Sequence, residues 1–262
     1  MLLNLLSKNG ASPGSMTQGF NRIIAESILY QAFLLSTRRP FAPYFDVDPQ
    51  FVTNVERLLA PPDSQDSSYA ACSPVLGVPT SLYRLKLRII TFYNMPAQQS
   101  PENLAQLRSD MDYWEALVVP RAAPCLTSAS AAHTFDLVIL ATSLLLDLVT
   151  ESFTYHLPID LLCLLNSDNS PRWQVESCLD ILRQPQEVEK WTGMFLALWP
   201  LLILGYAVTS DEDMALIQGI LGKMRNRLGY GEVQRIQEEL RKVRDSRNYE
   251  ALSSTNNMLI EI

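Results

Sequence analysis

The segment Gly10–Gly14 has the G-x-S-x-G spacing of a hydrolase nucleophile elbow, with Ser12 at the nucleophile position. In that motif the backbone N–H of the residue after the serine helps to bind the oxyanion. Here that residue is Pro13, which has no N–H, and no buried strand pattern precedes the segment. The sequence therefore predicts a turn at Ser12 and no nucleophile.

The remaining nucleophiles and acids also lack the spacing that catalysis requires. Cys125 and His133 are eight residues apart across a predicted loop-to-helix transition, which defines no mutual geometry, and no third orienting group is apparent. Asp110 and Asp112 are two apart on a predicted helix, so we expect them on different faces and solvated. The chain has no H-E-x-x-H, phosphate-binding loop or G-x-G-x-x-G motif. We predict a protein that is not an enzyme and has no catalytic, cofactor-binding or metal-ligating residue.

The cysteines do not form a zinc motif, because no two of them have the close spacing of a zinc finger or knuckle. The opening residues MLLNLLSKNG lack the basic start and cleavage pattern of a secretory signal, and no N-x-S/T acceptor occurs. We therefore expect reduced thiols that fill the core of an intracellular protein. The four cysteines are Cys72, Cys125, Cys163 and Cys178.

Charge argues against nucleic acid as the main partner, since the net charge is −7 and the sequence pI is about 4.9. A local exception is the segment 223–247, which has eight Lys or Arg residues and four acidic residues. Such a segment could contact phosphate, an anionic membrane or an acidic partner. A solvated helix face is the more common role, and we favour it.

The segment 191–210, WTGMFLALWPLLILGYAVTS, runs for twenty residues without a formal charge. Its length would permit a membrane span, which needs roughly 20 apolar residues. Pro200 removes a backbone donor in the middle of the segment, and Gly193 and Gly205 weaken a helix on either side. We predict two shorter buried helices that meet at Trp199–Pro200, and no membrane association.

Most of the chain has the apolar period of amphipathic helices, and no segment has the sustained alternation of a strand. Ser100–Pro101 opens one predicted helix, and Ser210 with Asp213 resembles a capping box that opens another, ended by Gly229. The helical segments expected from their apolar stripes are 20–35, 51–59, 82–90, 104–118, 132–149, 214–228 and 233–243.

We therefore predict an all-α fold of about nine or ten helices, arranged as a solenoid-like or globular helical array. Without a linker or a fixed repeat in the sequence, we expect a single irregular domain over 17–248. The segments 1–16 and 249–262 are predicted to be a flexible N-terminal segment and a C-terminal tail. The stripe on 233–243 is expected to pack inward, because so short a seam rarely supports a coiled coil.

Five segments, in this order and spacing, carry a resemblance to a known family. They are Glu26–Tyr30, SPVLGVPTSLYRL at 73–85, the apolar helix at 135–149, WPLLILGYA at 199–207, and the pattern from Asp211 through Gly229–Gly231 to Arg247. Over most of residues 17–248 the chain resembles the fungal-specific transcription factor domain, the helical regulatory region of zinc binuclear cluster transcription factors.

The resemblance implies a nuclear regulatory module, which could also occur in the cytoplasm, and which acts on a fungal metabolic gene set such as a secondary-metabolite cluster. Full-length members bind DNA through clustered cysteines that hold zinc, and no such cluster precedes residue 17. We therefore expect no sequence-specific DNA binding by this chain alone, and a protein partner that is either a zinc-cluster regulator or a second copy.

A second hypothesis is that the chain is a soluble ligand-binding or accessory protein of a biosynthetic pathway. Its pocket would be lined by aromatic residues at helical spacing, although such residues are more often plain core. The residues in question are Trp191, Phe195, Trp199 and Tyr206.

Overall fold

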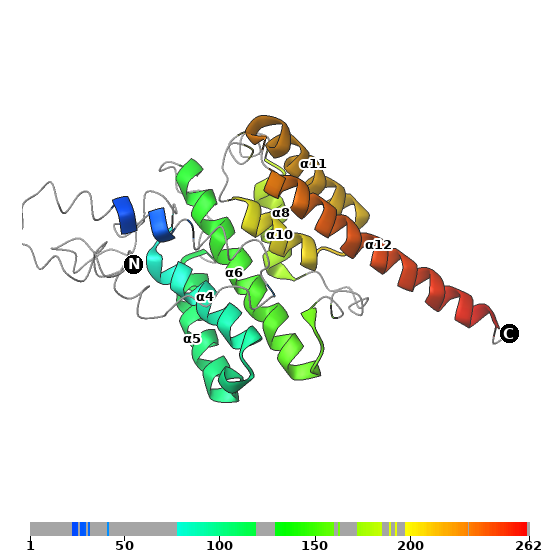
Figure 1. Cartoon of the computed structure of the whole chain (residues 1–262), viewed down its shortest axis with the longest axis horizontal. Helices are drawn as coiled ribbons and strands as arrows, with labels where there is room; N and C mark the ends of the chain where they lie inside the picture. Colours follow the sequence, from blue (N-terminus) through cyan, green and yellow to red (C-terminus); the bar gives the residue numbers. More distant parts are fainter. Residues whose placement is uncertain are drawn as a thin grey trace, which may run out of the picture. The chain divides into compact units, whose positions relative to one another are not determined.

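The structure is a computed structural model, and its described part is helical (Figure 1). It describes residues 23–25, 27–29, 31, 41, 78–118, 129–159, 162, 172–184, 189, 192, 197–229 and 231–260, without the side chains of 129–134, 228 and 248–260. Within these residues there are eight helices and no strand, which confirms the all-α prediction and comes close to the expected number. The chain divides into two compact units, Met1–Leu87 and Arg88–Ile262.

The helix-start signals that lie within the described residues are mostly confirmed. The helix α5 spans Pro101–Val118, and the Ser100 hydroxyl accepts a hydrogen bond from the backbone N–H of Asn103 at 3.2 Å. The helix α4 spans Thr80–Asn94 and is followed by the short 3₁₀ helix η1 at Pro96–Gln98. Predictions for 1–16, for 51–59 and for most of 20–35 lie outside the described residues.

In the unit Arg88–Ile262, the helix α6 is the central element (Figure 1). It spans Ala129–Tyr155 and contacts α5, α8 and α10, so most of its described side chains are buried. The predicted helix stopped at Val149, six residues too early. The helix continues because no Gly or Pro follows until the chain turns at His156, where φ is 54°.

Helix α6 also contains the one stretch, among the described residues, that is long and apolar enough to cross a membrane by length and composition. This stretch is Phe135–Tyr155, and 61% of its most apolar window is buried inside the protein. The stretch contains the acidic residues Asp136, Asp147 and Glu151, which do not remove it from this class. A buried core helix passes the same test, so the feature is weak evidence for a membrane.

Helix α10 spans Leu198–Ala207 and contacts α6, α8, α11 and α12. Because it has neighbours on every side, all of its residues except Ala207 are buried, which confirms the predicted burial for residues 198–206. The predicted junction at Trp199–Pro200 lies close to the observed start of α10, whereas residues 193–196 of the predicted first helix lie outside the described residues. The helix begins at Leu198, and Pro200 lies in its first turn, where an N–H has no partner within the helix in any case.

The last two helices form an antiparallel hairpin that covers α10. Helix α11 spans Asp211–Leu228, its N-cap Ser210 accepts from the N–H of Asp213 at 3.0 Å, and it ends at Gly229 with φ of 65°. Both ends were predicted. Helix α12 spans Gly231–Ile260, so residues 249–260 of the predicted C-terminal tail are helical, in keeping with the absence of Pro and Gly after Gly231.

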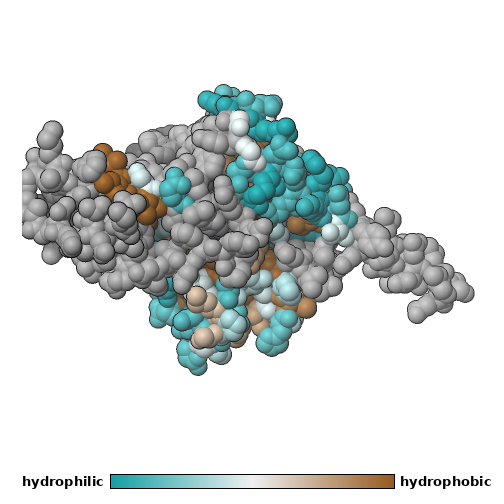
Figure 2. Space-filling model, in the orientation of Figure 1, coloured by the Kyte–Doolittle hydropathy of each residue, from teal (hydrophilic) through white to brown (hydrophobic). Residues whose placement is uncertain are grey.

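The predicted stripe of α12 does pack inward. The side chains of Val233, Ile236 and Leu240 are fully buried, and Val243 is half-buried. The described outer faces of α11 and α12 are largely hydrophilic (Figure 2). The basic segment 223–247 therefore supplies an inner apolar stripe and an outer polar face, as expected for a solvated helix.

Candidate functional site

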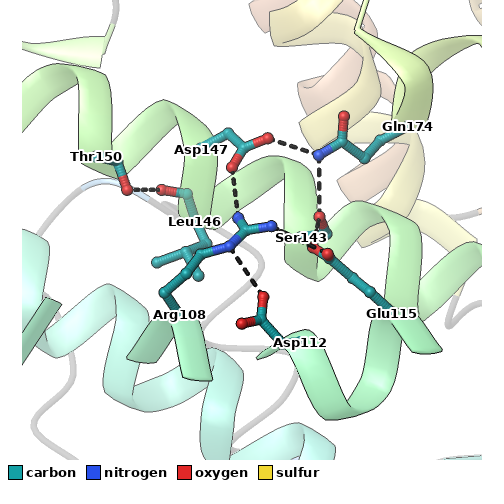
Figure 3. A network of polar contacts seen from close by, with 8 residues as sticks. All are labelled: Arg108, Asp112, Glu115, Ser143, Leu146, Asp147, Thr150 and Gln174. Carbon is teal, nitrogen blue, oxygen red and sulfur yellow. Dashed lines mark hydrogen bonds and ion pairs between the residues drawn. The ribbon is translucent and has the colours of Figure 1, made fainter. Parts of the chain in front are cut away.

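The densest polar cluster in the described residues lies where α5, α6 and α8 meet (Figure 3). Helix α8 spans Trp173–Leu182 and was not predicted. The centre of the polar cluster is Arg108 of α5, whose guanidinium contacts three carboxylates. It donates to Asp112 at 3.3 Å, to Glu115 at 2.8 and 3.0 Å, and to Asp147 of α6 at 2.8 Å.

A second set of hydrogen bonds connects this ion pair to α8. The Ser143 hydroxyl of α6 donates to the carboxylate of Glu115 at 2.5 Å, and it accepts from the side-chain amide of Gln174 at 3.0 Å. The same amide donates to the second carboxylate oxygen of Asp147 at 2.6 Å (Figure 3). Ser143 and Gln174 are both buried, so these bonds satisfy groups that would otherwise be costly to remove from water.

The cluster has one positive charge and three negative charges, and its charged side chains range from largely buried to exposed. The side chain of Glu115 is 14% exposed, that of Arg108 is 39% exposed, and that of Asp112 is 63% exposed. Burial disfavours the charged guanidinium, but the negative charges of Glu115, Asp147 and Asp112 outweigh it and raise the pKa of Arg108. Arg108 is therefore a permanent cation that holds the carboxylates together.

The cluster extends along α6 through one further ion pair. Arg172, the residue before α8, donates to Glu151 of α6 at 2.7 Å. These polar contacts fix the three helices relative to one another. They add to the apolar packing of α5, whose buried residues are Leu107, Met111 and Trp114. The pairing of these groups favours a structural role for the cluster. The carboxylates bind Arg108, and the Gln174 amide and the Ser143 hydroxyl bind each other.

The two aspartates of α5 are solvent-accessible, as predicted, since the side chain of Asp110 is 32% exposed and that of Asp112 is 63% exposed. Asp110 and Asp112 do lie on different faces of α5, but each carries an ion pair, Asp110 with Arg88 and Asp112 with Arg108. No group of three or more His, Cys, Asp or Glu residues that could hold a metal ion occurs among the described residues. Of the four cysteines, Cys178 is free and buried, and the other three lie outside the described residues.

Cys178 lies in the core on α8, where burial raises the pKa of its thiol far above the ordinary range. It is therefore a poor nucleophile, in agreement with the core-filling role expected from sequence. Ser12 and Cys125 lie outside the described residues, as does the side chain of His133. His156 is exposed at the end of α6.

The aromatic residues suggested as a pocket lining are in part core residues. Trp199 is fully buried and Tyr206 is 5% exposed, both on α10, whereas Trp191 and Phe195 lie outside the described residues. The Tyr206 hydroxyl donates to Glu239 of α12 at 2.6 Å. This contact ties α10 to α12.

A second polar feature lies at the C-terminal end of α10. Arg247 of α12 donates to the backbone carbonyls of Tyr206, at 2.7 Å, and of Val208. Carbonyls at a helix end lack partners within the helix, and a cation there also interacts favourably with the helix dipole. Nearby, Arg244 pairs with Asp211 at the start of α11 at 3.0 Å. The hairpin is thus anchored to the turn that follows α10.

No protein-family model matches the sequence, and comparison with curated proteins and with solved structures gives no match.

Proposed function

We propose that the chain is a non-enzymatic transcription-regulatory protein, which acts through protein contacts on a fungal metabolic gene set. The proposal rests on the resemblance to the fungal-specific transcription factor domain. The main argument for that resemblance is the order of the five segments along the chain. One observation supports it most directly. The segment WPLLILGYA forms the buried helix α10, and the closing pattern from Asp211 to Arg247 forms the hairpin that packs on it.

The other segments of the resemblance are also helical where they are described. The apolar stretch 135–149 belongs to α6, and the SPVLGVPTSLYRL segment leads into α4, which begins at Thr80. In the unit Arg88–Ile262 the order of these segments would therefore correspond to a core helix, α6, with α10 packed on it and the hairpin outside. A helical array of this kind offers outer faces for partners without requiring a catalytic site.

The internal pairing of the Arg108 cluster supports the non-enzymatic part of the proposal. Its buried members, Ser143 and Gln174, bond to each other, and Gln174 also bonds Asp147. A catalytic acid or nucleophile has to meet a substrate, and these groups are already engaged across helix interfaces. The net charge of −7 is consistent with a protein partner and with no independent binding to DNA.

A tethering assay tests the regulatory role directly. The chain is fused to an unrelated DNA-binding domain in a fungal host that carries a reporter with the matching operator. We expect the reporter output to change relative to the DNA-binding domain alone. The matched controls are Leu202→Asp, which should unfold the domain, and Ala215→Asp, which places the same charge at an exposed position on α11.

The regulatory proposal predicts that Ala215→Asp retains the reporter effect and that Leu202→Asp loses it. A reporter that does not respond to the folded fusion, together with unchanged transcripts after deletion of the gene, would refute the proposal. A gel shift with the purified chain is expected to give no specific DNA complex. Strong thermal stabilisation by a pathway metabolite, without any effect on transcripts, would instead favour the accessory ligand-binding role.

A further inference from the structure

We draw no further inference here: the strongest candidate, the solvent-exposed face of the α11–α12 hairpin with Lys223, Arg225, Arg241 and Lys242, has the exposed acidic residues Glu238 and Asp245 among its cations, and nothing in the structure shows what covers it.

Discussion

Helix α10 packs tightly on α12 at Gly205, and this contact leads to a quantitative prediction. A Cβ atom at this position would lie 2.5 Å from both methyl carbons of Leu240 and 3.1 Å from its Cγ. Leu240 is fully buried, so its side chain can move only by displacing its neighbours. The change Gly205→Ala therefore combines a local gain in helix propensity with a steric cost between two helices.

The two effects have opposite signs and can be compared. Replacing a helical glycine by alanine stabilises a helix by up to about 1 kcal/mol. Overpacking a core by a methyl group typically costs about 1–3 kcal/mol. We expect Gly205→Ala to lower the free energy of unfolding by roughly 0–2 kcal/mol, because the steric cost exceeds the gain at a site this crowded.

A double-mutant cycle separates the two effects. Leu240→Ala alone should cost about 2–5 kcal/mol, since it leaves a cavity between α10 and α12. In that background the added methyl group of Gly205→Ala enters the cavity, so the same change should stabilise the protein by up to about 1 kcal/mol. The expected coupling between the two positions is roughly 1–3 kcal/mol.

The assay is equilibrium unfolding in urea, followed by far-UV circular dichroism, with the four members of the cycle measured under the same conditions. Gly219→Ala is the matched control, because Gly219 lies on α11 with no atom within 4 Å of the new Cβ. It should stabilise the protein equally in both backgrounds. If Gly205→Ala also had the same effect in both backgrounds, the close packing of α10 on α12 would be refuted.

Four further predictions test other parts of the structure, each by urea unfolding. Burial lowers the pKa of Lys86 well below its ordinary value of 10.5, so between the two pKa values the unfolded chain binds a proton that the folded chain does not, and the free energy of unfolding should rise with pH up to about 10.5; Lys86→Met should flatten this rise in the range below pH 10.5, and an unchanged slope would contradict it. His156→Gly should stabilise by about 0.5–1 kcal/mol, because His156 has a φ of 54° that glycine adopts without strain, whereas a loss of stability would count against this geometry. Leu202→Asp should abolish the helical signal, since it puts a charge at a fully buried position, and a folded variant would show that the position is accessible to water. Arg108→Met should cost roughly 1–3 kcal/mol, because it leaves the partly buried carboxylates of Glu115 and Asp147 close together without their shared cation, while Asp112→Asn at an exposed side chain should change stability by less than about 1 kcal/mol; equal effects would show that the cluster is only a surface ion pair.

Local signals in the sequence predicted those helix ends whose causes are themselves local. Ser210 and Asp213 fix the start of α11, and Gly229 fixes its end, because each acts through backbone groups within a few residues. Helix α8 was missed although Val175, Cys178 and Leu182 have helical spacing, as the segment is short and lies between prolines.

The Arg108 cluster was missed for a different reason. Ser143 and Asp147 are polar residues four apart on the apolar helix α6, and that spacing was a usable sign of a buried polar contact. Their partners Arg108, Glu115 and Gln174 lie on other helices, 27 to 39 residues away for the contacts with α6. One sequence contains no information on which distant polar groups will be brought together, since that depends on how the helices pack.

The anchoring of α10 by Arg247 has a consequence for the order in which the chain can fold during synthesis. Helix α10 is buried on all sides, and one of its covers is α12, which is translated 24 to 53 residues after Ala207. Before α12 emerges from the ribosome, the nascent chain lacks both the Arg247 donor for the carbonyls of Tyr206 and Val208 and the apolar cover of Val233, Ile236 and Leu240. The nine-residue apolar surface of α10 would then be open to chaperones, so stalled chains with α12 inside the ribosome and chains with α12 outside it should differ sharply in chaperone binding.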